Sequence, residues 1–75
     1  MVDHTVDAKG LSCPLPILRA RRALDGLEAG AVLEVLATDP GSVADFEAFC
    51  GTTGHALLSS EHRGEVFRFL LRKSG

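Results

Sequence analysis

An apolar run, Val32–Ala37, lies between two segments of helical periodicity, and this succession constrains the fold more than any other feature of the chain. Mostly apolar strands of this kind are typical of the buried centre of a sheet. A strand-like stretch, His4–Ala8, precedes the first helical segment, and residues 55–61 form another after the second. After a predicted turn at residues 62–64, apolar and more polar side chains alternate along residues 67–72, which predicts a strand with one buried face. The predicted order is strand, helix, strand, helix, strand, strand.

These patterns predict an α/β (α+β) two-layer open-faced sandwich, with two helices on one face of a mixed four-stranded sheet. The two strand–helix–strand units should form right-handed crossovers between parallel strands, and the last two strands an antiparallel hairpin. Seventy-five residues make one small domain, 1–75, which buries only about 60% of the surface of its unfolded chain.

Charge and composition argue against several classes of function. The formal net charge of −2 provides no electrostatic footprint for nucleic acid, and the four phenylalanines fall at predicted core positions rather than on a stacking surface. No stretch approaches the roughly 20 apolar residues that cross a bilayer, and the N-terminus lacks the apolar run of a signal peptide. Two cysteines are too few for a secreted disulfide framework. We therefore expect a cytoplasmic protein that binds neither nucleic acid directly nor a membrane.

Cys13 stands at the predicted start of the first helix, just after a bend at Lys9 and Gly10. Pro14 falls where the first helical residue should be, a position that tolerates a fixed φ and a missing N–H. Cys13 is therefore expected at or next to the N-cap, where unpaired N–H groups and the helix dipole favour an anion. Because the thiolate is the nucleophilic form of cysteine, we identify Cys13 as the candidate catalytic residue.

Other interpretations of Cys13 find less support. Free cysteine is often a buried small hydrophobe, but an exposed turn suits that role poorly. A dithiol oxidoreductase needs Cys-x-x-Cys, and here the fourth position is Pro16. Zinc needs about four ligands and a cysteine hydrolase needs a histidine base, yet the histidines are scattered, at His4, His55 and His62. We therefore expect no metal and no cofactor, and a lone activated cysteine suits a carrier better than a self-sufficient enzyme.

The second helix is expected to begin with Asp39 as its cap and Pro40 as its first residue. Val43, Phe46 and Cys50 recur at helical spacing and form its predicted core face. Cys50 is accordingly interpreted as a buried, inert thiol, with a reactive or disulfide role as the alternative.

Two leucines lie on the side of the first helix that points away from its predicted core stripe. The stripe consists of Ile17, Ala20, Leu24 and Leu27. Leu15 and Leu18 project to the other side, near Arg19 and Arg22, with Arg21 at the border. One interpretation is a small apolar contact area with a basic rim, suited to a protein partner. The other is that single exposed leucines need no explanation, and the sequence leaves both open.

Residues 10–16, Gly-Leu-Ser-Cys-Pro-Leu-Pro, resemble the Cys-Pro-x-Pro signature of the TusA/SirA-like sulfur-carrier family. The similarity extends over nearly the whole chain, at Gly30 and at residues 38–40, 54–55 and 69–73. It implies the predicted fold and a sulfurtransferase that carries sulfane sulfur as a persulfide on Cys13. Residues 13–20 and 38–42 are more similar to the members associated with sulfur oxidation than to those of transfer-RNA thiolation.

The resemblance implies a relay between proteins. A persulfide donor, such as a cysteine desulfurase, a rhodanese or a DsrE-like protein, would load Cys13, and an acceptor sulfurtransferase would take the sulfur. The backbone amides of Leu15 and Ile17 at the helix end are expected to stabilise the charged forms, since Pro14 and Pro16 have no N–H.

Charged residues around the nucleophile are expected to assist. Lys9, Arg19 and Arg22 would add positive potential, and the resemblance places Asp39 on the edge that faces partners. The alternative function is a binding or redox-regulatory module that uses Cys13 as a modifiable contact, without sulfur transfer.

Overall fold

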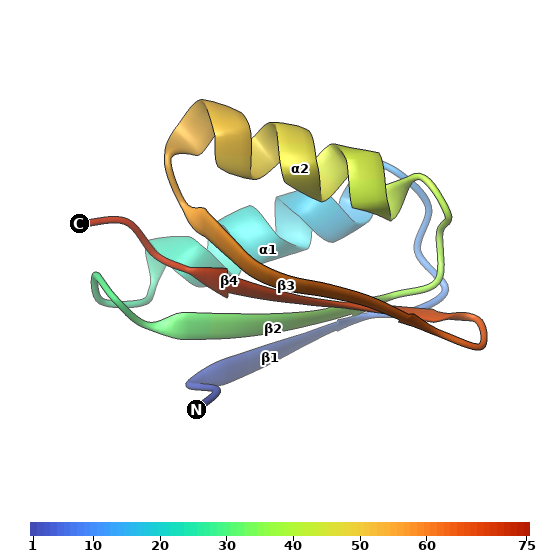
Figure 1. Cartoon of the computed structure of the whole chain (residues 1–75), viewed down its shortest axis with the longest axis horizontal. Helices are drawn as coiled ribbons and strands as arrows, with labels where there is room; N and C mark the ends of the chain where they lie inside the picture. Colours follow the sequence, from blue (N-terminus) through green and yellow to red (C-terminus); the bar gives the residue numbers. More distant parts are fainter.

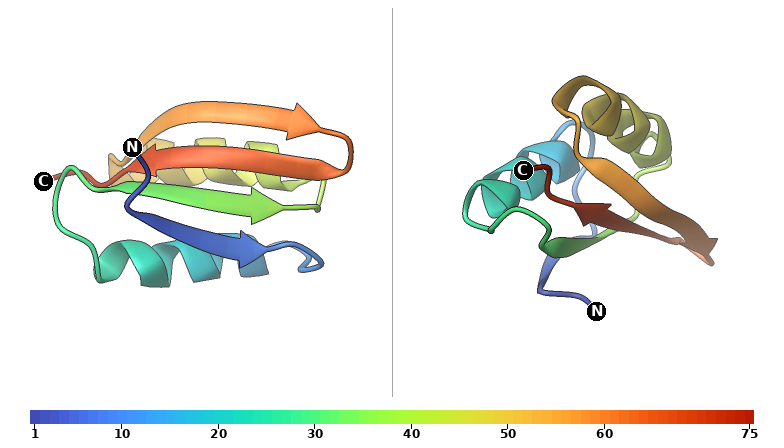
Figure 2. Two further views of the ribbon diagram at one scale, coloured as in Figure 1. Left: turned by 90° about the horizontal axis from the view of Figure 1, so that it is seen from below. Right: turned by 60° about the vertical axis from the view of Figure 1, so that its left-hand side comes forward.

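Four strands form one mixed sheet, in the order β1-β2-β4-β3, in the computed structural model, which describes residues 1–75 (Figure 1). The elements along the chain are β1 His4–Ala8, α1 Leu15–Asp25, β2 Val32–Ala37, α2 Ser42–Thr53, β3 Ala56–Arg63 and β4 Val66–Arg72. β1 and β2 are parallel, whereas β4 is antiparallel to both of its neighbours. Both helices cover the same face of the sheet, and Figure 2 shows the other face open. The predicted two-layer sandwich is confirmed.

The core lies between the helices and the covered face of the sheet. Alternate residues of β4, Phe67, Phe69 and Leu71, are buried in it, as the sequence pattern predicts. Phe69 is fully buried and stacks on Phe46 of α2, with ring centroids 4.5 Å apart. Cys50 of α2 joins the same core and is only 8% exposed, so its predicted burial is confirmed.

The helix α1 packs on the sheet through the predicted stripe. Ala20 and Leu24 are buried, and Ile17 and Leu27 are partly buried against the core. Pro16 is also fully buried, although the sequence pattern assigns it no core position. Neither helix is long and apolar enough to pass through a membrane.

A row of polar side chains crosses the open face of the sheet. Thr5 of β1 donates a hydrogen bond to Glu34 of β2 at 3.0 Å, and Arg68 of β4 pairs with Glu34. The same guanidinium pairs with Glu61 of β3 at 2.9 Å. Hydrogen bonds from Arg68 lower the pKa of both glutamates. Because these side chains are partly exposed, the pairs add little net stability, but they link all four strands.

The start of α1 differs by one residue from the prediction. The helix begins at Leu15 rather than Pro14, because the Leu15 N–H first closes a turn on the Ser12 carbonyl oxygen at 2.9 Å. Pro14 itself has φ −100° and ψ 18°, outside the helical region, and the peptide bond between Cys13 and Pro14 is cis. Pro14 therefore occupies the N-cap position, and Cys13 lies next to it in the turn before the helix, which agrees with its predicted place at or next to the N-cap.

The predicted start of α2 is also wrong. The helix begins at Ser42 instead of Pro40, since the Ser42 N–H donates to the Asp39 carbonyl oxygen at 3.0 Å and a turn precedes the helix. No side chain caps α2, so Asp39 does not have the predicted capping role. In the hairpin, β3 continues to Arg63 and the turn lies slightly later than predicted, at Gly64, whose φ of +60° favours glycine.

Three connections meet at one end of the sandwich, which we call the loop end. They are the β1–α1 loop, the β2–α2 loop and the β3–β4 turn (Figures 1 and 2). Both termini lie at the opposite end of the molecule (Figure 1). Because β1 and β2 are parallel, the loops that follow them leave the sheet at the same edge.

Candidate functional site

Cys13 lies in the β1–α1 loop at the loop end, and its free thiol is exposed. Gly10, with φ +82°, allows the chain to reverse after β1 and bring Cys13 back towards the helices. In open α/β sheets, ligands bind beyond the carboxyl ends of the parallel strands. The predicted nucleophile therefore occupies the edge where such a fold places its chemistry, and it is accessible to other proteins.

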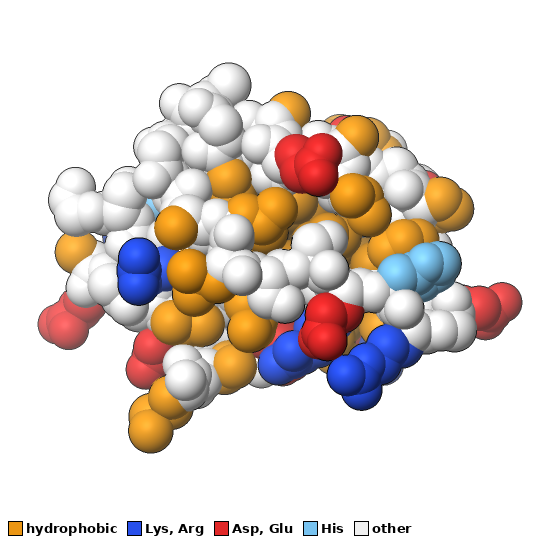
Figure 3. All heavy atoms as spheres, viewed as in Figure 1, with side chains coloured by type: hydrophobic (Ala, Val, Ile, Leu, Met, Phe, Trp, Pro, Cys, Tyr) orange, Lys and Arg blue, Asp and Glu red, His pale blue; other side chains and the backbone are white.

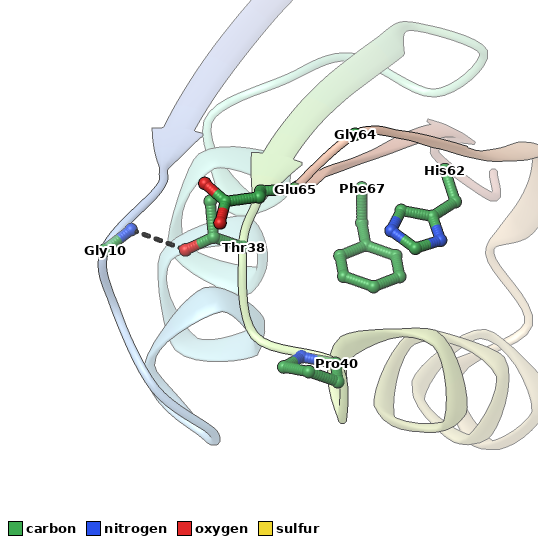
Figure 4. Close-up of a pocket in the computed structure, with 7 residues that line it drawn as sticks. All are labelled: Gly10, Thr38, Pro40, His62, Gly64, Glu65 and Phe67. Carbon is green, nitrogen blue, oxygen red and sulfur yellow. Dashed lines mark hydrogen bonds between the residues drawn. The ribbon is translucent and has the colours of Figure 1, made fainter.

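Side chains of the β2–α2 loop hold the Cys13 loop in place. Asp39 Oδ2 accepts a hydrogen bond from the Cys13 backbone N–H at 2.8 Å. Thr38 Oγ1 accepts one from the Gly10 N–H at 2.9 Å, as Figure 4 shows. Asp39 therefore supports the loop that carries Cys13 and does not act as the helix cap that its sequence position predicts.

A small cleft of about 290 Å³ opens beside Cys13, between α1 and α2. The residues that line it are Cys13, Pro14, Ile17, Asp45, Ala48, Phe49 and Thr52. Most of these side chains are apolar, and the only charged one is the carboxylate of Asp45. We call this space the Cys13 cleft.

The surroundings of Cys13 raise the pKa of its thiol, whereas the helix N-terminus predicts a lowered value. The largest cause is a hydrogen bond to the Asp45 carboxylate, followed by desolvation and by the negative charges of Asp45 and Asp39. The prediction is wrong because carboxylates from α2 and the β2–α2 loop raise the pKa. The start of α1 does little to offset them, since Pro14 and Pro16 have no N–H and the Leu15 amide is already bonded to the Ser12 carbonyl at 2.9 Å.

A second groove, of about 230 Å³, lies on the outer side of α1. Four residues line it, Leu15, Leu18, Arg19 and Arg22, and we call it the leucine–arginine groove. Leu15 is 44% exposed and Leu18 is 52% exposed, so the predicted apolar area with basic neighbours is present. Lys9 and Arg21 are exposed but line neither this groove nor the Cys13 cleft.

Surface charge is mixed on the face that Figure 3 shows. Acidic and basic side chains alternate there with apolar atoms, and no extended basic field forms on this face. The chain as a whole carries a formal net charge of −2. The face shown in Figure 3 therefore lacks the extended basic patch that is typical of nucleic-acid-binding surfaces.

None of the three histidines lines the Cys13 cleft. His62 stacks on Phe67, with ring centroids 4.1 Å apart, in a separate open depression of about 640 Å³ at the loop end (Figure 4). Glu65 lines this depression but Cys13 does not. His55 accepts a backbone hydrogen bond from the C-terminal segment at 3.0 Å. No group of three or more His, Cys, Asp or Glu side chains is arranged to hold a metal ion.

Asp45 is not among the site residues predicted from the sequence. Asp45, Ala48 and Thr52 recur at helical spacing, on a face of α2 distinct from the core face of Phe46 and Cys50. A helix face of small residues with one carboxylate indicates that another element packs closely against it. The sequence pattern does not identify that element, because the packing of α1 against α2 decides it.

Comparison with known proteins gives one consistent result. The profile described as sulfurtransferase TusA matches residues 4–73. The chain is 54% identical to the sulfur carrier protein TusA of Allochromatium vinosum over 72 residues. This alignment covers 96% of this chain and 95% of that protein. It resembles the crystal structure of the SirA-like protein from Desulfitobacterium hafniense with a TM-score of 0.84 and 28% identity, over 96% of this chain and 99% of the other. Sequence, fold and the exposed cysteine agree, and the chain therefore belongs to the TusA family of sulfur carriers.

Proposed function

We propose that the protein accepts sulfane sulfur as a persulfide on Cys13 and passes it to a partner protein. The observation that carries this proposal is the exposed, free thiol of Cys13, on a loop held by Asp39 and beside a cleft without a histidine base. Such a thiol can exchange sulfur with other proteins but lacks the groups of a self-sufficient hydrolase. Residues 1–75 act as one carrier domain, in a reducing cytoplasm where both cysteines stay free.

Loading is an exchange at sulfur. The Cys13 thiolate attacks the outer sulfur of a donor persulfide, and a bond forms between that sulfur and Sγ. The S–S bond of the donor breaks, and its electron pair leaves on the donor thiolate. Unloading repeats the step with an acceptor cysteine as nucleophile and the Cys13 thiolate as leaving group. Neither step changes the total number of electrons on the sulfur atoms, so no redox cofactor is required.

The partners are a persulfide donor (a cysteine desulfurase, a rhodanese or a DsrE-like protein) and an acceptor sulfurtransferase. We place the relay in sulfur oxidation, because residues 13–20 and 38–42 are similar to the family members of that process. Thiolation of transfer RNA, of the 2-thiouridine type, is the other candidate. A loaded carrier that transfers sulfur to acceptors of only one of these systems would decide between them.

Intact-protein mass spectrometry after incubation with polysulfide or a loaded cysteine desulfurase tests the function. We expect a gain of about 32 Da per added sulfur, reversed by reductant, and peptide mapping should locate it on Cys13. A folded protein that gains no sulfur on Cys13 would contradict the proposal. It would instead indicate the binding or redox-regulatory module in which Cys13 is only a modifiable contact.

The leucine–arginine groove is the proposed docking surface for these partners. Leu18→Asp should slow sulfur transfer to the acceptor about tenfold, since burying a charge in an interface commonly costs a kcal/mol or more. Because Leu18 is 52% exposed, the thermal unfolding midpoint should not change. Leu58→Asp is the matched control, because Leu58 is 46% exposed on β3, outside this groove. Equal transfer rates for Leu18→Asp and Leu58→Asp would show that partners do not dock on the leucine–arginine groove.

A further inference from the structure

We propose that Asp45 is a positioning residue that holds the Cys13 thiol in the Cys13 cleft and selects sulfur donors that bring a positive charge to it. The inference rests on the proposed function, because it concerns how the same thiol is loaded. It assigns a role to a carboxylate on α2 that the transfer step itself does not use.

The geometry places one unpaired carboxylate against the nucleophile. Asp45 lines the Cys13 cleft together with Cys13, and it lies in the first turn of α2, where the helix dipole stabilises a negative charge. The ion pairs of the protein involve Arg63 and Arg68, and none includes Asp45. Its carboxylate is therefore free to accept a hydrogen bond from the thiol or to bind a cation that enters the cleft.

The remaining neighbours of the thiol do not compensate this charge. α1 contributes Ile17 to the cleft and the residue before this helix is Pro14, and both side chains are apolar. The β2–α2 loop contributes Asp39, a second carboxylate, whose Oδ2 is bonded to the Cys13 backbone N–H. Both acids act in the same direction and raise the pKa of the Cys13 thiol. In the empty carrier, these two carboxylates therefore disfavour the thiolate of Cys13, the form that attacks sulfur.

A donor can reverse this restraint. A lysine or arginine of the donor that enters the cleft would pair with Asp45, weaken its hydrogen bond to the thiol and favour the thiolate of Cys13. An acidic or neutral surface would leave the restraint in place. The chemistry of the cleft therefore favours a protein partner that presents a basic side chain next to its persulfide.

Alkylation of Cys13 tests the restraint without any sulfur donor. With iodoacetamide at pH 7, Asp45→Asn should alkylate about threefold faster than the wild type, since the larger thiolate fraction is partly offset by lower intrinsic nucleophilicity. The rise of the alkylation rate with pH should shift to lower pH in this variant. Glu47→Gln is the matched control, because Glu47 is an exposed acid on the same helix that does not line the cleft. Unfolding curves of both variants exclude a loss of the fold.

A pair of charged reagents tests donor selection. Methanethiosulfonates that carry a trimethylammonium or a sulfonate group differ in charge, and the wild type should react faster with the cationic one. Asp45→Asn should reduce this preference about threefold, whereas Glu47→Gln should retain it. An unchanged pH profile in Asp45→Asn would overturn the restraint, and an unchanged reagent preference would overturn the selection. Neither of these measurements depends on sulfur loading. A failure of the Asp45 inference is therefore distinguishable from a failure of the proposed function, which the mass measurement on Cys13 tests.

Discussion

Cys13→Ser is expected to lower sulfur loading from about one added sulfur per chain to none, because a hydroxyl cannot form the persulfide. Cys50→Ala should load as the wild type does. Cys50 is only 8% exposed, and burial raises the pKa of its thiol, so it offers neither access nor thiolate. The measurement is the intact mass of each variant after incubation with the same loaded donor, followed by transfer to an acceptor in a single turnover.

The two cysteine variants separate chemistry from structure. Cys13 lies on the surface, so its replacement should leave the unfolding curve unchanged while loading disappears. Cys50 lies in the core, so its replacement should destabilise the protein while loading persists. If Cys13→Ser still gained sulfur, or if the sulfur of the wild type were located on Cys50, Cys13 would not be the nucleophile.

Phe69→Ala is expected to lower the free energy of unfolding by about 3–5 kcal/mol, the usual effect of removing a large aromatic side chain from a core. Phe69 is fully buried and stacks on Phe46 at 4.5 Å between ring centroids, so no solvent can replace the lost contacts. Small domains have roughly 0.05–0.15 kcal/mol of stability per residue, or about 4–11 kcal/mol for 75 residues. The variant should therefore lose a large share of its stability, and urea unfolding followed by circular dichroism measures this as a lower midpoint.

Leu58→Ala provides the comparison for Phe69→Ala. Leu58 is 46% exposed on β3, and its truncation should change the free energy of unfolding by no more than about 0.5 kcal/mol. A loss for Phe69→Ala no larger than that of Leu58→Ala would mean that the packing between α2 and β4 is not what holds the two layers together.

The architecture could be predicted because its signals are local. The alternation of Phe67, Phe69 and Leu71 with more polar residues identifies a strand with one buried face, and the structure buries these three side chains. The exposure of Leu15 and Leu18 follows from helical spacing in the same way. Each of these signals lies within a few residues and does not depend on which elements become neighbours.

The details of the site could not be predicted because they depend on long-range contacts. An aspartate before a proline favours a helix cap, but the carboxylate of Asp39 bonds to Cys13 instead. The rule for helix N-termini predicts a lowered pKa for Cys13, but Asp45 on the other helix raises it. In both cases a residue from another element decides the outcome, and local spacing does not identify that residue.

The hydrogen bond from the Cys13 backbone N–H to Asp39 determines at which stage of folding the loop around Cys13 takes its final shape. Its two partners are 26 residues apart, so the bond can form only after β2 has added to β1 and the β2–α2 loop is in place. During synthesis, Cys13 leaves the ribosome before Asp39 does. Until Asp39 has also emerged, the loop that carries Cys13 lacks this hydrogen bond. The loop that carries Cys13 is therefore expected to reach its final geometry only in chains that have folded through β2 and the β2–α2 loop.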